Sequence, residues 1–262
     1  MTISKIRALG IDLGSTTTKM VGVDENGEMI WHRLEPADPH LEDQVELFFH
    51  AVHQEMNPPQ NIPSIATGYG RRLVSQATRQ VTEISCHARG IFQECGQGGT
   101  LVDIGGQDSK VISLSPQGKV LDFVMNDKCA AGTGRFLENM ALRLQVPLIN
   151  LGGEALSTTQ ETSISSTCTV FAESEVISLI AHGVPLPEIL RGLHRSLVKR
   201  IAAMIYTVGL VPPLMLSGGV ALNLAIRQLL AEETGLGVII PRYPQLVGAL
   251  GAALLALEIT DH

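Results

Sequence analysis

The chain of 262 residues is long enough to bury a large core, as two lobes or as one large α/β domain. Its formal net charge of −7 and its few aromatic residues (one Trp, three Tyr and six Phe) argue against a nucleic-acid surface and against base-stacking platforms. Four cysteines without a signal-peptide pattern, and apolar runs that are short or broken by Gly, Pro and Asn, predict a cytoplasmic protein with reduced thiols and no membrane span.

The first hundred residues predict a strand hairpin followed by helical segments. Ile6–Asp12 is expected to form a strand and Lys19–Asp24 its antiparallel partner. Asp24–Gly27 then turns the chain into a third strand. The further elements predicted in this part are the strand Met29–Leu34, the helix Leu41–Met56, the strand Ile65–Thr67, the loop Gly68–Arg71 and helical segments to about Glu94.

The hairpin pattern restarts near residue 101. Leu101–Gly106 predicts a strand, Lys110–Ser115 its hairpin partner and Ser115–Gly118 a turn. Four residues recur at one offset of 91 positions, and the pairs are Asp12 and Asp103, Gly14 and Gly105, Lys19 and Lys110, and Gly27 and Gly118. We interpret this recurrence as an internal duplication that places one hairpin unit in each of two lobes.

The segment Gly96–Gly99 is short, flexible and poor in packing side chains, so we expect the lobes to comprise residues 1–95 and 96–262. The last helix, at about 246–259, is expected to pack back on the first lobe. The other elements predicted late in the chain are the amphipathic helix Leu186–Val208, the strand Leu214–Leu216, a helix opened by Ser217–Val220 and the strand Val238–Pro241.

Asp12–Lys19 has the residue types of a phosphate-binding turn. Gly14 lets the backbone approach an anion, Asp12 can hold water on a divalent cation, and the hydroxyl and N–H groups of Ser15, Thr16 and Thr17 can donate to phosphate oxygens. Asp103–Lys110, with Gly105 and Gly106, would grip the same phosphates from the other lobe. Either segment alone could be an ordinary hairpin turn, but the related pair favours a nucleotide site.

Other polar residues have candidate roles in nucleotide chemistry. Gly218 and Gly219, with Asn223 one turn further on, suit the close approach of a nucleoside to the backbone. Asp103 is expected to position Mg²⁺, and Gln107 and Asp108 to orient an attacking water. The sequence offers no strong general base. Lys19 and Lys110 could contact phosphate or be solvated.

Two cysteines each precede a segment with helical periodicity. Cys129 lies within Asn126–Phe136 and Cys168 within Ser165–Glu175. The helical positions are Leu137, Met140, Ala141 and Leu144 after the first cysteine, and Val170, Phe171, Ser174, Ile177 and Ile180 after the second. A thiolate at a helix N-terminus favours metal or anion contact, whereas the alternative is that both are small buried residues.

The duplicated Asp-x-Gly hairpins and the Gly-Gly loop resemble the actin-like ATPase superfamily of sugar kinases, Hsp70 and actin. The whole chain, in order, resembles more specifically the activator ATPases of 2-hydroxyacyl-CoA dehydratases, of the BadF/BadG/BcrA/BcrD type, close kin of the ATP-binding subunits of benzoyl-CoA reductase. The segments that carry this resemblance are Asp12–Lys19, Ala66–Arg71, Glu83–Ala88, Asp103–Asp108, Asn126–Phe136, Ser165–Val176 and Ser217–Ala221.

This resemblance implies an α/β actin-like ATPase fold of two duplicated ribonuclease H-like lobes with a nucleotide cleft between them. It implies binding of ATP or ADP with Mg²⁺, and a homodimer that holds one [4Fe–4S] cluster on two cysteines from each subunit. The matching positions are Cys129 and Cys168, and such a cluster usually needs four thiolates. Gly132, Thr133 and Gly134 are then expected to sense the nucleotide.

The implied activity is ATP-driven transfer of low-potential electrons to a 2-hydroxyacyl-CoA dehydratase-type partner, with reduced ferredoxin or flavodoxin as the donor. A small-molecule kinase of the sugar-kinase type and a nucleotide-sensing ATPase without a redox role remain the alternatives. Cys95 lacks a motif and is expected to be inert. His87, next to Cys86, is expected to form structural hydrogen bonds, because adjacent side chains of a helix diverge.

Overall fold

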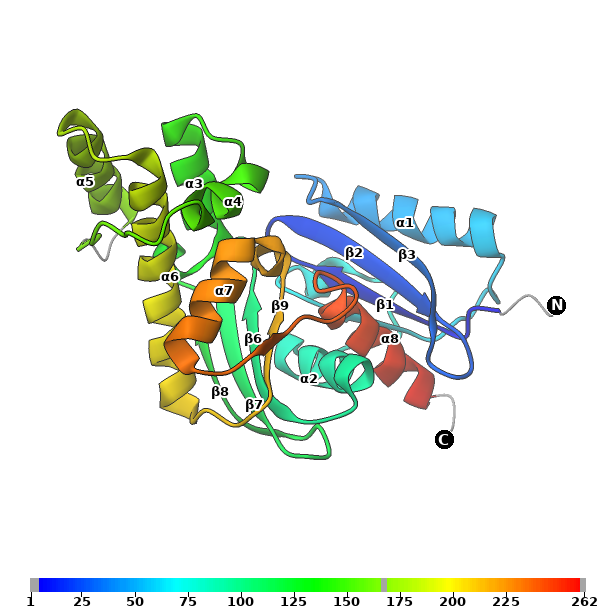
Figure 1. The fold of residues 1–262 in the computed structure, drawn as a ribbon. Coiled ribbons are helices and arrows are strands. Elements are labelled where there is room, and N and C mark those ends of the chain that lie inside the picture. The colour runs from blue at the N-terminus through cyan, green and yellow to red at the C-terminus, as the bar shows by residue number, and fades with distance from the viewer. Residues whose placement is uncertain (1–4, 166–168, 260–262) are drawn as a thin grey trace. The chain divides into compact units, whose positions relative to one another are not determined.

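The computed structural model describes residues 5–165 and 169–259, and the chain divides into two compact units (Figure 1). Unit 1 comprises Met1–Gly98, Pro116–Val120 and Gln245–His262, and unit 2 comprises Gly99–Ser115 and Leu121–Pro244. Each unit contains one five-stranded sheet with its own helices.

The sheet of unit 1 has the strand order β3-β2-β1-β4-β5. β1 pairs with β2 in antiparallel and with β4 in parallel orientation. The strands are β1 (Ala8–Leu13), β2 (Thr17–Val23), β3 (Met29–Pro36), β4 (Ser64–Thr67) and β5 (Arg79–Gln80). The two-residue β5 was not predicted, because it is exposed and polar and lies in a segment that was expected to be helical.

The sheet of unit 2 repeats this topology, with the order β10-β9-β6-β7-β8. β6 pairs with β7 in antiparallel and with β9 in parallel orientation, as β1 does with β2 and β4. The strands are β6 (Gly99–Ile104), β7 (Ser109–Leu114), β8 (Val120–Asn126), β9 (Leu214–Ser217) and β10 (Val238–Ile239). Asp12 faces Lys19 and Asp103 faces Lys110 at equivalent register positions, so the predicted duplication is confirmed.

The two faces of β1 pack against different helices of unit 1 (Figure 1). Leu9, Ile11 and Leu13 point to the side of α1 (Leu41–Met56) and join its buried side chains in one apolar core. Gly10, on the other side, lies against α8 (Val247–Ile259), where an added Cβ would come within 2.0 Å of the Ala249 carbonyl oxygen. The sheet therefore packs on α1 through side chains and on α8 through close backbone contact.

Helix α8 also packs closely on α2 (Glu83–Cys95) through glycines. A Cβ on Gly251 would lie 1.7 Å from the Cys86 carbonyl oxygen, and one on Gly90 would lie 2.1 Å from that of Val247. α8 is apolar around its whole circumference and almost entirely buried. Its small residues thus allow one helix to cover both a strand and a second helix.

The core of unit 2 is made by one face of β6 and β7 with several helices. Val102, Ile104 and Val111 meet the buried face of α6 (Leu186–Val208), which was predicted with the same bounds. The other helices of this unit are α3 (Gly134–Leu144), α4 (Leu151–Leu156), α5 (Thr169–Ala181) and α7 (Leu224–Thr234). Among the described residues of both units, the short 3₁₀ turns are Arg71–Leu73, Ala130–Gly132, Leu148–Asn150 and Gly219–Leu222.

The starts of two predicted helices in this part of the chain need correction, and one strand was missed. The helices expected directly after Cys129 and from Ser217 begin later, at Gly134 and Leu224, because 3₁₀ turns precede them. Strand β8 was missed because its residues are mostly exposed and do not alternate between buried and polar positions. The helix predicted after Cys168 is confirmed as α5; it buries Ala172 and Val176, while four large apolar residues at its helical positions are exposed.

Within the described ranges, no helix combines the length and the apolarity that crossing a membrane would need.

The glycine contact between α8 and α2 can be tested by adding one methyl group. We expect Gly251→Ala to lower the free energy of unfolding by roughly 1–3 kcal/mol or more, because the methyl group overlaps the Cys86 carbonyl. The measurement is urea unfolding followed by circular dichroism. Gly153→Ala is the matched control: it also lies in a helix, with open space around the added methyl. Equal stability of both variants would contradict the packing described.

Candidate functional site

The first predicted phosphate turn follows β1 in unit 1. Asp12 is buried near the end of the strand, and Lys19 Nζ lies 3.1 Å from its Oδ2 oxygen. The N–H of Gly14 donates to the carbonyl of Thr17 at 3.1 Å, which closes a tight turn. Ser15 is exposed, and Thr16 and Thr17 are half-buried. The turn therefore presents hydroxyl groups beside a fixed carboxylate.

The backbone of a neighbouring loop comes close to this carboxylate at Gly68. Its φ of +90° is in the region that favours glycine, and an added Cβ would lie 2.5 Å from Asp12 Oδ1. The Arg71 guanidinium donates to the Gly68 carbonyl at 3.1 Å. The predicted loop Gly68–Arg71 thus encloses Asp12 by backbone contact.

The second predicted turn follows β6 in unit 2 and is held by charge. Asp103 is 4% exposed, and its Oδ1 accepts a hydrogen bond of 2.7 Å from the Ser217 hydroxyl. Lys110 Nζ lies 3.4 Å from Asp103 Oδ2 and 2.5 Å from Asp108 Oδ2. Lys110 is only 2% exposed, so the alternative of a solvated lysine is wrong. Two carboxylates surround one buried cation.

Both turns have the same backbone geometry. The N–H of Gly105 donates to the Asp108 carbonyl at 2.9 Å, as that of Gly14 does to Thr17. Gln107 is exposed at the tip of the second turn. Asp108, predicted to orient water, is connected to Asp103 through Lys110. The contact of Ser217 with Asp103 was not predicted, because the sequence motif around Asp103 does not reveal it. The adjacent Gly-Gly sequence was the only sequence signal for that position.

The turn of unit 2 is hydrogen-bonded to the segment that follows Cys129. The N–H groups of Gly134 and Arg135, which begin α3, donate to the carbonyls of Gly105 and Gly106 at 2.8 and 2.7 Å. Asn126 brackets Cys129, since its amide nitrogen donates to the Cys129 carbonyl at 2.8 Å and its oxygen accepts from the Cys129 N–H at 3.1 Å. The turn and the cysteine segment therefore form one connected structure.

The predicted nucleoside loop lies after β9. Gly218 has a φ of +85°, and an added Cβ would lie 2.3 Å from the Ile104 carbonyl oxygen. Asn223 caps α7, because its Oδ1 accepts from the Ile226 N–H at 3.1 Å, while its Nδ2 lies 3.0 Å from His194 Nε2. Burial lowers the pKa of His194 to about 4, so the ring is neutral and Nε2 can accept from Asn223. Nucleoside binding by Asn223 remains a prediction.

The cysteines have different environments. Burial raises the pKa of the Cys86 thiol to about 12, and burial with the nearby Glu94 also raises the pKa of the half-buried Cys95. Cys129 is exposed, and Cys168 lies outside the described residues. Within residues 5–165 and 169–259, no group of three or more His, Cys, Asp or Glu side chains could hold a metal ion. Cys129 is thus the accessible thiol of the three described.

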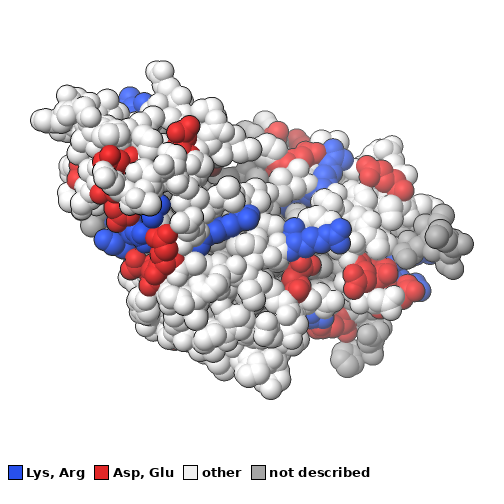
Figure 2. All heavy atoms as spheres, viewed as in Figure 1, with Lys and Arg blue, Asp and Glu red and all other residues white. Residues whose placement is uncertain are grey.

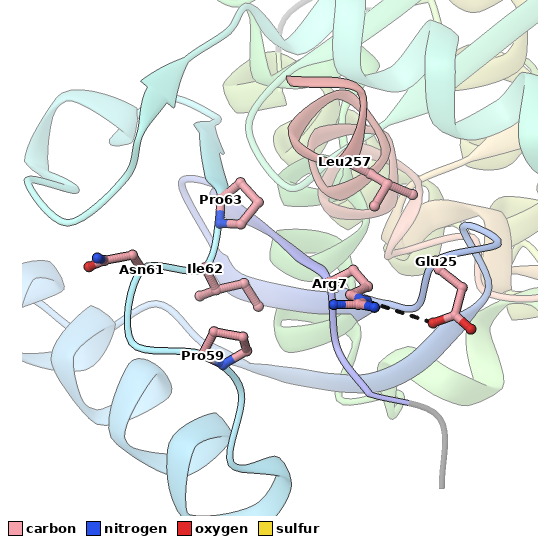
Figure 3. A pocket seen from close by; sticks show the side chains of 7 residues that line it. All are labelled: Arg7, Glu25, Pro59, Asn61, Ile62, Pro63 and Leu257. Atoms are coloured by element: carbon pink, nitrogen blue, oxygen red, sulfur yellow. Dashed lines mark ion pairs between the residues drawn. The ribbon is translucent and has the colours of Figure 1, made fainter. Parts of the chain in front are cut away.

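A pocket of about 350 Å³ in unit 1 is separate from the phosphate turn (Figure 3). It lies beside the Arg7–Glu25 ion pair of 3.8 Å, and the remaining lining residues are Pro59, Asn61, Ile62, Pro63 and Leu257. Arg7 precedes Asp12 by five positions, which is about 16 Å along an extended strand. On the face drawn in Figure 2, acidic and basic side chains are interspersed.

The duplicated sheets and their paired Asp–Lys turns define an α/β protein with the actin-like ATPase fold. A glucokinase of the ROK family from Streptomyces griseus shares this fold, with a TM-score of 0.60 over 96% of this chain and 99% of the kinase, at 14% identity. That likeness concerns the fold alone.

The chain belongs to the BadF/BadG/BcrA/BcrD ATPase family, whose model matches residues 9–256. It is similar to the solved activator of the 2-hydroxyisocaproyl-CoA dehydratase from Clostridium difficile with bound ADPNP, with a TM-score of 0.89 and 39% identity, covering 97% of this chain and 95% of the activator. It is also 41% identical to the activator of lactoyl-CoA dehydratase from Anaerotignum propionicum, over 95% of this chain and 97% of the relative.

Replacing the two equivalent lysines tests the charge arrangement. We expect Lys110→Met to cost roughly 3–5 kcal/mol of stability, because it leaves two carboxylates without the buried cation between them. Lys19→Met, at the duplicated position, should cost less, since Lys19 is more exposed and is paired with Asp12. Urea unfolding of both variants is the measurement. A larger loss in Lys19→Met would contradict this account.

Proposed function

We propose that this protein is an ATP-dependent iron–sulfur activator that transfers low-potential electrons to a 2-hydroxyacyl-CoA dehydratase-type partner. The observation that carries the proposal is the pair of hydrogen bonds from Gly134 and Arg135 to the carbonyls of Gly105 and Gly106. These bonds join a turn suited to phosphate to the segment of an exposed cysteine. The names of the activator relatives support the same assignment.

ATP is bound through the two duplicated turns. In the first, Asp12, Gly14 and Lys19, with the hydroxyls of Ser15, Thr16 and Thr17, contact the phosphates. In the second, Asp103 holds the water shell of Mg²⁺, while Ser217 and Lys110 fix its carboxylate. Gly105 and Gly106 provide the backbone approach, and Gly218, Gly219 and Asn223 lie at the nucleoside. The ADPNP bound by the relative from Clostridium difficile is consistent with a triphosphate ligand.

Hydrolysis requires a water molecule that is aligned with the terminal phosphate. Gln107 and Asp108 orient this water, Gln107 from the exposed tip of the turn and Asp108 from its ion pair with Lys110. Backbone N–H groups of the turn stabilise the negative charge that develops on the phosphate oxygens, while Lys110 holds Asp103 and Asp108 in place. The chemistry consists of positioning and charge stabilisation.

Cys129 and Cys168 are the cluster ligands of this chain. When bound, a [4Fe–4S] cluster supplies a one-electron redox centre of low potential. Cys129 suits a ligand because its thiol is exposed and Asn126 holds its backbone on both sides. Cys86 and Cys95 are unsuitable as ligands, because their raised pKa values disfavour the thiolate that binds metal.

Two cysteines leave half of a four-thiolate shell unfilled, so a second copy of the chain completes it in a homodimer. The exposed side chains of α5, the helix that follows Cys168 in the sequence, support an interface at this helix. They are Val170, Phe171, Ile177 and Ile180, each at least 48% exposed. Apolar residues on one solvent-facing helix surface mark an interaction site.

ATP binding couples to electron delivery through the connected turn. A γ-phosphate on the Asp103 turn displaces the carbonyls that α3 binds, and Gly132, Thr133 and Gly134 transmit this movement to Cys129. The dimer then donates electrons with ATP bound, and hydrolysis resets it. Reduced ferredoxin or flavodoxin in the cytoplasm serves as the donor. A kinase or a nucleotide sensor of the same fold would need neither iron nor an electron-accepting partner.

The nucleotide site is tested by removing charge from each aspartate. We expect Asp12→Asn and Asp103→Asn to lower ATP hydrolysis roughly 100-fold or more, because each loses the charge that orders the metal-bound water. Steady-state phosphate release with Mg·ATP is the measurement. Asp122→Asn is the matched control, since Asp122 is exposed on β8 and should keep full activity. Full activity in both site variants would contradict the assignment.

The cluster assignment is tested by replacing single cysteines. Cys129→Ser and Cys168→Ser should each lose the iron and sulfide of the anaerobically prepared dimer, because each removes two of four thiolates across the symmetric pair. Cys95→Ser is the control and should retain both. Iron and sulfide analysis with the anaerobic absorption spectrum is the measurement. A monomer that holds a full cluster would show the shared site to be wrong.

A further inference from the structure

A polar side chain lies among the apolar side chains of α6 that form the core of unit 2. His194 is fully buried, and its Nδ1 lies 2.7 Å from the Leu190 carbonyl oxygen one turn earlier. Its Nε2 lies 3.0 Å from Nδ2 of Asn223, and Oδ1 of Asn223 accepts from the Ile226 N–H at 3.1 Å. Three consecutive hydrogen bonds thus connect the buried face of α6 to the start of α7.

The two backbone groups at the ends of this series determine the direction of each hydrogen bond in it. The Ile226 N–H can only donate, so the atom of Asn223 that faces it is the oxygen, and Nδ2 faces His194. The Leu190 carbonyl can only accept, so Nδ1 of His194 carries the ring hydrogen and Nε2 is the acceptor. Burial lowers the pKa of His194 to about 4, so the ring keeps this acceptor at neutral pH. The Asn223 amide therefore has one fixed orientation.

Asn223 ends a loop that begins at the buried Asp103 carboxylate. Ser217, the last residue of β9, donates to Asp103 at 2.7 Å. Asn223 follows directly after the 3₁₀ turn Gly219–Leu222, and its own side chain is half-buried. The loop is thus held at its first end by Asp103 and at its last end by His194.

We propose that His194 is a positioning residue that fixes the Asn223 amide for a hydrogen bond to an acceptor atom of the nucleoside, and this inference rests on the proposed ATP site. Asn223 uses one N–H for His194 and its oxygen for Ile226, so its second N–H is the donor left for a ligand. A ring nitrogen of the base or a ribose oxygen is the matching acceptor. Without the Nε2 acceptor, the amide loses the partner that holds it, and the nucleoside must order it on binding.

Helix α4 approaches the same amide from another side. A Cβ on Gly152 would lie 2.7 Å from Asn223 Oδ1 and 3.1 Å from the backbone nitrogen of Leu224. α4 also packs on both α6 and α7, the two helices that the hydrogen bonds of His194 connect. A side chain at position 152 would therefore displace the Asn223 amide.

The test compares His194→Gln with His194→Asn in the binding of Mg·ADP, measured by isothermal titration calorimetry. Glutamine can place an amide oxygen where Nε2 lies and accept from Asn223, whereas the shorter asparagine reaches only the position of Nδ1. We expect His194→Asn to weaken binding roughly 3- to 10-fold, as for the loss of one hydrogen bond, and His194→Gln to stay within about twofold of the wild type. Both variants should bind Mg·pyrophosphate as the wild type does, because pyrophosphate lacks the nucleoside. A general structural defect would weaken the binding of both ligands.

Gly152→Ala provides a second, independent variant, and Gly153→Ala is its matched control, because the methyl group added at position 153 meets open space. Gly152→Ala should weaken Mg·ADP binding about as much as His194→Asn does, yet add little in the double variant, since both act on one amide. Gly153→Ala should bind Mg·ADP as the wild type does.

Asn223→Asp tests the contact without a nucleotide. The introduced carboxylate should raise the pKa of His194, because an opposite charge beside the ring favours the imidazolium. An NMR titration of the His194 ring nitrogens is the measurement. An unchanged titration of His194, equal Mg·ADP binding by His194→Asn and His194→Gln, or an equal loss of Mg·pyrophosphate binding would overturn the inference. A wild type that binds no Mg·ADP would contradict the proposed function, and the inference with it, whatever the His194 titration shows.

Discussion

The first turn of α3 is capped by main-chain carbonyls of another loop, and the arrangement of unit 2 depends on this contact. The first N–H groups of any helix lack partners within the helix. Thr133, at the N-cap position, forms no side-chain cap, and Gly105 and Gly106 accept from Gly134 and Arg135 instead. The close approach favours glycine, since a Cβ on Gly134 would lie 3.0 Å from the Gly105 oxygen. Movement of the turn must therefore displace the start of α3.

Those carbonyls are held in place by a buried charge. Lys110 lies between Asp103 and Asp108, at opposite ends of the same turn, and a lysine buried to this degree must keep its partners. Ser217 on β9 then connects the turn to the loop that carries Gly218. One ion-paired lysine thus fixes the phosphate-type turn, the start of α3 and the neighbouring strand end. A ligand that competes for Lys110 would act on all three.

The sequence was sufficient for the features that depend on local pattern. The offset of 91 revealed the duplicated sheets because a hairpin places Asp12 opposite Lys19, and Asp103 opposite Lys110, in a fixed register. The bounds of α6 followed from its apolar period. Strands β5 and β8 escaped prediction, because both lie at sheet edges and are mostly exposed. The contact of Ser217 with Asp103 joins residues 114 positions apart, and no local pattern encodes such a distance.

The packing of α8 explains why duplication did not preserve two equal sites. Small residues let α8 lie against both β1 and α2. Gly10 of β1 allows the contact with the strand, and Gly251 of α8 allows the contact with α2. Gly248, one turn before Gly251, consequently lies over the Asp12 carboxylate, where the ring of His87 reaches in from α2. In unit 2 the corresponding carboxylate meets a hydroxyl and a lysine. Asp12 thus lies against α8 and is paired with Lys19 of β2, whereas Asp103 is held by the strand residues Ser217 and Lys110. Substitutions in α8 should therefore affect Asp12 more than Asp103.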